Sequence, residues 1–289
     1  DMRKVVLGDL LFHDVRLSVD NTVSCATCHA LNTGGVDNKQ FSEGVGGQKG
    51  GVNAPTVFNA HYNFVQFWDG RAATLAAQAG GPPLNPVEMA HKSFDDICAR
   101  LNEDEGFKKA FTEVYPDGIT EANITDAIQE FERTLLTPNS RFDKYLKGDM
   151  AALSAEEIAG YELFKKYNCA TCHVGENLGG QSYELMGIKA DYFADRNTEI
   201  TFEDHGRNKE TKTERDMHRF KVPGLRNIAL TAPYFHDGTK QTLEEAVRDM
   251  AKYEVGVNLS EEETARLVAF LHTLTGEYKG KLLTNDNLK

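Results

Sequence analysis

The sequence has no run of 18 or more apolar residues and no recognisable signal peptide. Since a membrane-spanning helix needs about 20 mostly apolar residues, these absences predict a mature, soluble chain. The sequence also has fewer basic than acidic residues: 32 Lys and Arg compared with 44 Asp and Glu, which gives a formal net charge of −12. This imbalance argues against nucleic acid as a partner and favours a partner with a basic docking face.

Cysteine is scarce. Of the five cysteines, four belong to a pentapeptide, Cys-Ala-Thr-Cys-His, that occurs twice. A structural zinc site needs a second Cys or His pair within about 12–20 residues of the first, and neither copy has one. A thioredoxin-like redox pair gives no reason for a His after the second Cys in both copies. The copies contain Cys25, Cys28 and His29, and Cys169, Cys172 and His173.

The repeated pentapeptide is typical of covalent attachment of c-type haem. In C-x-x-C-H the two thiols bond to the vinyl groups of the porphyrin, and the adjacent His is placed to bind the iron. We therefore predict two c-type haems, with His29 and His173 as their proximal iron ligands. Because thioether attachment takes place outside the cytoplasm, we expect a periplasmic protein.

The fifth cysteine, Cys98, shares a helical spacing with three apolar residues. It is expected to be a buried thiol on the apolar face of a helix, and no disulfide is expected. The other residues of this face are Phe94, Ile97 and Leu101.

The periodic segments all have the spacing of an α-helix, and none alternates convincingly with a period of two. The expected fold class is mostly α, with two cytochrome c-like haem domains and long loops. The stretch from Thr137 to Ser140 is the expected boundary, so that residues 1–137 and 138–276 form the domains and the tail 277–289 packs back on the first. The expected helices comprise an opening one with Val6, Leu7, Leu10 and Leu11, one over 72–79, one with Ile124, Ile128, Phe131 and Leu135 on one face, and four that begin at the capping boxes Ser93-x-x-Asp96, Ser154-x-x-Glu157, Thr242-x-x-Glu245 and Ser260-x-x-Glu263.

Two stretches are expected to be loops. The segment from Gly34 to Gly51 contains seven glycines, which indicates either a solvated surface loop or a loop that can press its backbone against a flat surface or change shape. The segment from Asp191 to Asp216 is strongly charged and aperiodic, and it is predicted to be a long exposed excursion.

Three further residues are candidates for chemistry. Trp68, the only Trp, lies between the two haem-binding segments and could serve core packing, electron transfer or both. Glu88 follows a proline-fixed turn and is either a proton carrier or a solvated side chain. Met250 continues a helical face downstream of His173, so it is either the second axial ligand of that haem or part of the core.

The sequence resembles the bacterial dihaem cytochrome c peroxidases. The resemblance rests on several sequence motifs, which occur in the same order and extend over nearly the whole chain. Both C-x-x-C-H motifs are among them. The others are Phe12-x-Asp14-x-Arg16-Leu17-Ser18, Gln66-Phe67-Trp68-Asp69-Gly70-Arg71, Val87-Glu88-Met89, Leu225-Arg226-Asn227-x-Ala229-Leu230-Thr231-Ala232-Pro233-Tyr234-Phe235-His236 and Val268-Ala269-Phe270-Leu271-His272.

The resemblance implies a function. Members of the family reduce hydrogen peroxide to water with electrons from a small cytochrome c or a blue copper protein, usually as homodimers. The haem on His29 would be the peroxidatic one, and the haem on His173 and Met250 would be the high-potential electron store, since His/Met ligation raises the potential.

Further site residues are carried over from the resemblance. Glu88 and Gln78 match positions of the distal pocket, and Trp68 matches the Trp between the haems. Members of the family also hold a calcium ion between their two domains. Calcium prefers oxygen ligands. The matching positions are Asn53, Thr231 and Pro233, the last two acting through their carbonyl groups.

One departure concerns activation. Most members carry a loop His that caps the peroxidatic iron in the oxidised form, and the matching position here is Val45, which cannot bind iron. His61 is the nearest alternative ligand. Two other functions stay open, namely a dihaem electron-transfer protein without peroxidase activity and a dihaem oxidase that matures a partner protein's cofactor, in which Tyr replaces the Met ligand.

Overall fold

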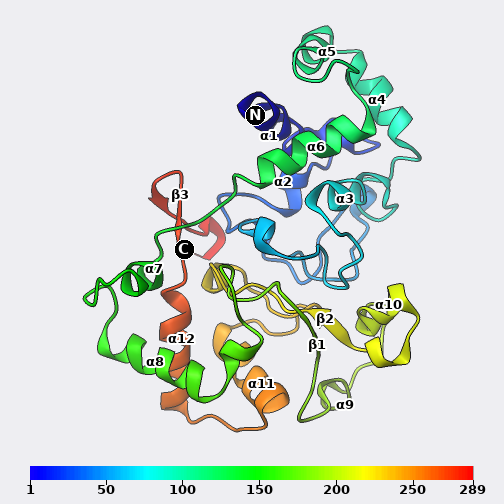
Figure 1. Ribbon diagram of the computed structural model, residues 1–289. Helices are drawn as coiled ribbons and strands as arrows, with labels where there is room; N and C mark the ends of the chain where they lie inside the picture. The colour runs from blue at the N-terminus through cyan, green and yellow to red at the C-terminus, as the bar shows by residue number, and fades with distance from the viewer. Residues whose placement is uncertain (289) are drawn as a thin grey trace.

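The computed structural model describes residues 1–288 and shows two helical halves, one above the other in Figure 1. The expected mostly α fold is confirmed, since the strands form only two short two-stranded ribbons within these residues. No helix in the described part is both long enough and apolar enough to cross a membrane. The first half contains α1 (Met2–Phe12), α2 (Cys25–Cys28), α3 (Leu75–Ala79), α4 (Phe94–Asn102), α5 (Glu105–Thr112) and α6 (Glu121–Glu132); the second contains α7 (Arg141–Leu146), α8 (Ala155–Lys166), α9 (Tyr192–Arg196), α10 (Asn208–Thr211), α11 (Leu243–Met250) and α12 (Glu261–His272), with strands β1 (Tyr183–Leu185), β2 (Arg219–Lys221), β3 (Glu277–Tyr278) and β4 (Lys281–Leu282).

In the first half, α1 packs against α6. Gly8 makes this close approach possible, because a Cβ there would collide with the Ala127 carbonyl group. Leu7 and Leu11 are buried as expected, whereas the other two apolar residues of the predicted α1 face, Val6 and Leu10, are exposed. The four apolar residues predicted for one face of α6 and its continuation, Ile124, Ile128, Phe131 and Leu135, are all buried.

All four predicted capping boxes begin helices, three of them in the second half. Both reciprocal hydrogen bonds form at Ser154, Thr242 and Ser260. At Ser93 only one of the two bonds forms, in which the Asp96 N–H donates to the serine hydroxyl. A further box that the sequence did not single out begins α7 at Ser140.

The predicted helix over 72–79 is shorter in the structure. Helix α3 begins at Leu75, because the Thr74 hydroxyl accepts from the Ala77 N–H and caps the helix there. The residues before it are held instead by an isolated β-bridge between Gln66 and Ala72. A side-chain cap therefore overrides the helix propensity of the two alanines that precede it.

The chain's tail lies against the first half, close to the junction of the halves in Figure 1. Leu283 is buried in a cluster with Phe12 and Phe58. The Asn285 side chain donates to the Thr33 carbonyl group at 2.9 Å. These contacts tie the last described residues to the segment that follows the first pentapeptide.

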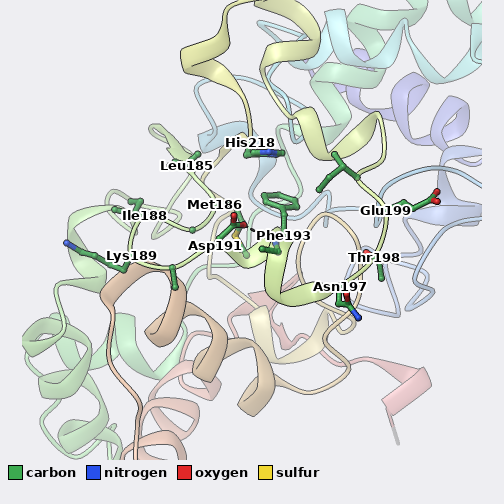
Figure 2. A pocket seen from close by; sticks show the side chains of 14 residues that line it. Leu185, Met186, Ile188, Lys189, Asp191, Phe193, Asn197, Thr198, Glu199 and His218 are labelled. Atoms are coloured by element: carbon green, nitrogen blue, oxygen red, sulfur yellow. Dashed lines mark hydrogen bonds between the residues drawn. The ribbon is translucent and has the colours of Figure 1, made fainter.

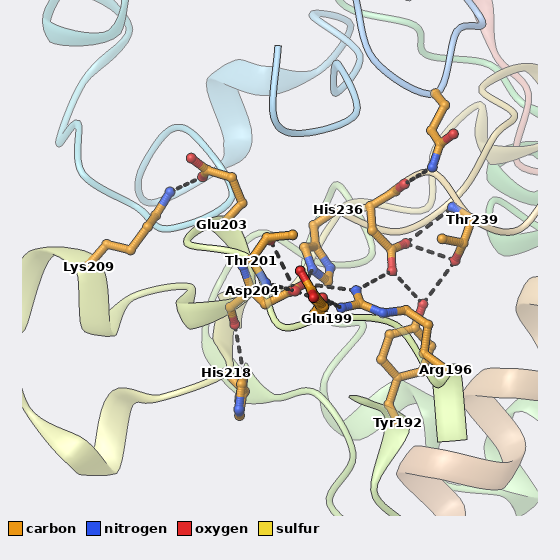
Figure 3. Close-up of polar contacts among 12 residues, drawn as sticks. Tyr192, Arg196, Glu199, Thr201, Glu203, Asp204, Lys209, His218, His236 and Thr239 are labelled. Atoms are coloured by element: carbon orange, nitrogen blue, oxygen red, sulfur yellow. Dashed lines mark hydrogen bonds and ion pairs between the residues drawn. The ribbon is translucent and has the colours of Figure 1, made fainter. Parts of the chain in front are cut away.

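The charged segment 191–216 is not simply an exposed excursion, which corrects the sequence-based expectation. It carries a buried ion cluster, shown in Figure 3. Asp204 is 1% exposed and accepts from Arg196 at 2.8 and 2.6 Å and from His236 Nε2 at 2.8 Å. Arg196 also pairs with Asp237 at 2.9 Å. An aperiodic charged segment is usually solvated, but here Arg196 and Asp204 pair with each other and with Asp237 and His236 of a later segment.

Replacing Asp204 with Ala is expected to lower the free energy of unfolding by about 3–5 kcal/mol, because Arg196 would stay buried with one of its two carboxylates gone. Burial alone would raise the pKa of Asp204, but Arg196 and His236 hold it below its usual value. The stabilisation is therefore present at neutral pH and is lost as the pH falls below the unfolded value of about 3.8. Chemical denaturation at pH 7 tests this. Glu210→Ala, at an exposed acid of the same segment, is the control, and equal effects of the two substitutions would contradict the expectation.

Candidate functional site

The first pentapeptide folds as the single helical turn α2. The Ser24 N–H donates to the Thr27 hydroxyl at 3.0 Å, which begins the turn, and the His29 N–H donates to the Cys25 carbonyl oxygen at 2.9 Å. The imidazole is thereby held directly after the turn that carries both thiols. Its Nδ1 lies 3.3 Å from the Gly35 carbonyl oxygen.

The second pentapeptide repeats this arrangement in the short helix η5 (Cys169–Thr171). Asn168 enters it with a left-handed backbone, at φ 58°. The His173 N–H donates to the Cys169 carbonyl oxygen at 3.0 Å, and its Nδ1 lies 3.1 Å from the Leu178 carbonyl oxygen.

In both histidines the contact with a carbonyl oxygen decides which ring nitrogen carries the proton. A carbonyl oxygen can only accept, so Nδ1 is the donor and the lone pair of Nε2 stays free to bind a metal. Burial lowers the pKa of His29 and of His173, which favours the neutral, ligating form of each ring.

The pentapeptide cysteines are not poised as thiolates. Burial raises the pKa of Cys25 to about 12, with Glu132 as the next cause, and raises the pKa values of Cys28 and Cys169 to about 11. Reactive cysteines of redox proteins have a lowered pKa, which these thiols do not show. None of the five cysteines forms a disulfide in the structure. Two protonated thiols and a neutral imidazole on one turn fit covalent attachment of haem.

Glu88 is brought to the first pentapeptide. Its Oε1 accepts from the Asn85 side chain at 2.9 Å. Burial raises the pKa of this carboxyl group, although Arg71 and Asn85 oppose the shift. The next residue, Met89, packs in the same apolar cluster as Cys25, and the Glu88 charge is one of the smaller causes of the raised pKa values of Cys25 and Cys28. A half-buried acid with a raised pKa is suited to proton transfer near neutral pH.

Arg71 and Asn85 were missed by the sequence reasoning. Arg71 lies over the Phe67 ring, 3.5 Å from its centroid, and pairs with Asp69 at 2.8 Å. Arg71 lies three residues after Trp68, and Asn85 lies three residues before Glu88. This closeness in sequence to two candidate residues was the only signal that could have pointed to them.

The glycine-rich loop docks on the Glu88 segment. The Val45 N–H donates to the Glu88 carbonyl oxygen at 2.9 Å, and the Gln48 side chain donates to the Pro86 carbonyl oxygen at 3.1 Å. Gly44 has no room for a Cβ against the backbone of Val87 and Glu88. Val45 is 5% exposed. At Gly44 and Val45 the loop therefore packs against protein backbone, while residues 46–49 are exposed.

Gln78 and His61 are less closely tied to this site. Gln78 is half-buried on α3, and its side chain makes no hydrogen bond to residues 1–288. His61 is exposed in the short helix η3 (Ala60–Tyr62), where its ring packs beside Tyr62.

Trp68 lies at the contact between the halves. Its Nε1 donates to the Asn53 carbonyl oxygen at 2.9 Å, and its own carbonyl oxygen accepts from the Lys221 N–H of β2 at 2.8 Å. The ring centroids of Trp68 and His236 are 6.4 Å apart. Trp68 thus connects a first-half segment to two segments of the second half.

The three positions matched to calcium ligands lie near the same contact. Asn53 is buried, and its N–H donates to the His236 carbonyl oxygen at 2.8 Å, which places it against the segment that contains Thr231 and Pro233. No group of three or more His, Cys, Asp or Glu side chains within residues 1–288 is arranged to hold a metal ion. A site there would depend on amide and carbonyl oxygens.

Met250 is the last residue of α11 and is half-buried. The helix continues into a π-helical turn, Ala251–Val255, a distortion that is frequent at functional sites. One turn earlier, Val247 packs in the same apolar cluster as Cys169. Helix α11 therefore flanks the second pentapeptide.

A hollow of about 930 Å³ opens beside α9 (Figure 2). Phe193 and His218 stack there with their ring centroids 4.1 Å apart. No pentapeptide residue lines it, and neither Glu88 nor Met250 does. It is separate from the sites described above.

Comparison with known families gives two matches that divide the chain. The profile of the family described as di-haem cytochrome c peroxidase matches residues 2–151, and the cytochrome c profile matches residues 158–275.

Several curated proteins are similar over most of the chain. The cytochrome c peroxidase Ccp of Escherichia coli is 59% identical over 96% of this chain, and the chain spans 59% of that relative's length. The cytochrome c551 peroxidase of Nitrosomonas europaea is 46% identical over 94% of this chain and 79% of its own. Among solved structures, a MauG-like protein associated with microbial copper homeostasis matches with a TM-score of 0.86 and 31% identity, covering 96% of this chain and 90% of its own.

Proposed function

Because the chain belongs to the di-haem cytochrome c peroxidase family, we propose that it reduces hydrogen peroxide to water with electrons from a small cytochrome c or a blue copper protein. Each peroxide molecule takes up two electrons and two protons and gives two molecules of water, so two one-electron donors are oxidised per turnover. The observation that carries the proposal is the half-buried Glu88 carboxyl group, which Asn85 holds on a segment whose next residue, Met89, packs in the apolar cluster of Cys25.

We propose different roles for the two haems. The haem held by Cys25, Cys28 and His29 would be the peroxidatic one, since the segment that carries Glu88 packs with Cys25. The haem held by Cys169, Cys172 and His173, with Met250 as second ligand, would be the electron store. When bound, the haems supply the redox chemistry. Trp68, which connects the two halves, would carry electrons between them.

The chain's own contribution to the reaction is proton transfer at Glu88. With its pKa raised, the carboxylate takes a proton from one peroxide oxygen and returns it to the other, so that water leaves rather than hydroxide. Asn85 orients the carboxyl group through its hydrogen bond to Oε1. Gln78, at the other matched pocket position, would contact the substrate.

The test of the function is turnover by the protein with both haems attached. Reduced cytochrome c should be oxidised in a 2:1 ratio to peroxide consumed. Peroxide consumption with no oxidation of the donor would contradict the proposal. Two six-coordinate haems with no turnover would instead support a pure electron-transfer protein.

We also propose a calcium ion, a dimer and a location. A calcium ion would bind Asn53 and the carbonyl oxygens of Thr231 and Pro233, since the Asn53 N–H bonds to the segment that contains them. The family resemblance suggests a homodimer, and haem attachment outside the cytoplasm suggests a periplasmic location. The net charge of −12 favours a donor with a basic face.

Replacing Met250 with Leu is expected to lower the potential of the second haem and to remove the sulfur-to-iron charge-transfer band, because a thioether ligand raises haem potential. Spectroelectrochemistry of the oxidised and reduced protein measures both. Met150→Leu, at a methionine that is 63% exposed, is the matched control. If Met250→Leu leaves the band and the potential unchanged, the assignment is wrong, and a Tyr-ligated, oxidase-like site becomes the better reading.

A further inference from the structure

Lys221, the last residue of β2, is a buried cation without a partner. It is 6% exposed. Within residues 1–288 its ammonium group forms no ion pair and no hydrogen bond. Lys209 offers a contrast, since its equally enclosed side chain pairs with Asp69 at 3.1 Å and also with Glu203.

A buried charge that lacks a partner is unfavourable by several kcal/mol, so proteins seldom keep one without an anion beside it. Burial lowers the pKa of Lys221 to about 8, which still leaves the group mostly protonated at pH 7. The chain therefore holds an almost buried lysine for which its own described residues supply no negative charge.

The backbone around Lys221 contacts residues of both haem-binding regions. Its backbone N–H donates to the Trp68 carbonyl oxygen at 2.8 Å. Two residues further on, the Pro223 backbone reaches the His173 ring and affects its pKa. Lys221 thus lies on the strand segment that leads from Trp68 to the axial histidine of the second haem.

The strand geometry separates Lys221 from the ion cluster of Figure 3. The ring of the preceding residue, Phe220, stacks on His236 with centroids 4.3 Å apart. Because successive side chains of a strand point to opposite faces, Lys221 points away from His236 and Asp204. Its antiparallel partner on β1 is Tyr183, which carries no carboxylate.

We infer that Lys221 is the counter-ion of a propionate carboxylate of the haem attached to Cys169 and Cys172. A haem has two propionates, and in a chain with a net charge of −12 a buried propionate needs a cation close by. The inference rests on haem attachment and not on peroxide turnover, so it can fail while the proposed function stands.

The ion pair has a measurable consequence. A cation beside the propionate offsets negative charge near the iron and favours the ferrous state. Lys221→Met, which keeps the length of the side chain and removes its charge, should shift the electron-exchange equilibrium between the second haem and a reference dye about tenfold towards the ferric form. For a one-electron couple this equals about 59 mV.

The experiment compares four holoproteins by spectroelectrochemistry: the wild type, Lys221→Met, Lys221→Arg and Lys189→Met. Lys189 is an exposed lysine of the same half, so its loss removes equal charge at the surface. The inference is supported if the electron-exchange equilibrium of the second haem shifts about tenfold in Lys221→Met, while the other proteins and the first haem show no such shift. A shift under twofold, a shift confined to the first haem, or an equal shift in Lys189→Met would each overturn the inference.

Lys221→Met could fail to fold, so a second measurement uses variants that keep the charge. Resonance Raman spectra report the propionate bending modes of the attached haem in the wild type and in Lys221→Arg. A guanidinium bonds to a carboxylate with a different geometry from an ammonium, so the band of one propionate should move. Identical propionate bands in the two proteins would overturn the inference.

Discussion

Replacing Glu88 with Gln is expected to reduce peroxide turnover by at least about 100-fold while both haem spectra stay intact. Proton transfer by a positioned side chain contributes typically 10²–10⁴-fold, and Gln keeps the size and the hydrogen-bonding capacity of Glu but cannot accept the proton. The structure strengthens this expectation, since burial raises the pKa of Glu88 and Asn85 holds its Oε1. Steady-state turnover with a reduced donor measures the loss.

The control for this substitution is Glu113→Gln, at a glutamate whose side chain is 65% exposed. It should change turnover by less than about twofold. The pH dependence of the rate is a second readout. Because the ionised carboxylate accepts the proton, the wild-type rate should fall as the pH drops through the raised pKa of Glu88. In Glu88→Gln this fall of the rate should be absent. A loss of less than about threefold in Glu88→Gln would mean that Glu88 is a bystander.

The second large effect is expected from placing a histidine at Val45. The wild-type loop offers the first haem no ligand at this position, so the all-ferric protein should react with peroxide at once. In Val45→His the new imidazole would compete with peroxide. If it held the iron about 99% of the time, the apparent affinity for peroxide would fall roughly 100-fold until the second haem is reduced.

Stopped-flow mixing of peroxide with all-ferric and half-reduced samples separates these cases. Val45→Leu, which fills the same buried position without a ligating atom, is the matched control and should behave as the wild type. A wild-type protein that reacts only after reduction would show that another ligand closes the site. His61→Ala would then be tested first, although His61 is exposed.

Some errors of the sequence reasoning share one physical cause. The charged segment around Asp204 was expected to be exposed because charge along a sequence correlates with solvation. Its burial depends on Arg196 and His236, of which His236 comes from a segment 32 residues away. For the loop that carries Val45, the glycines left open a solvated loop or one that presses its backbone against a surface, and only the fold shows its hydrogen bonds to the backbone of Pro86 and Glu88.

The sequence alone determined those features whose interacting residues are close together in the chain. The pentapeptides place two thiols and an imidazole on one turn, and the capping boxes close within four residues, so neither needs a distant partner. Only the tertiary structure decided that Glu88 is half-buried on a segment that packs with Cys25 and that Lys221 is almost buried without an anion. These properties arise from burial and from charges on segments far apart in the chain, and no local spacing encodes them.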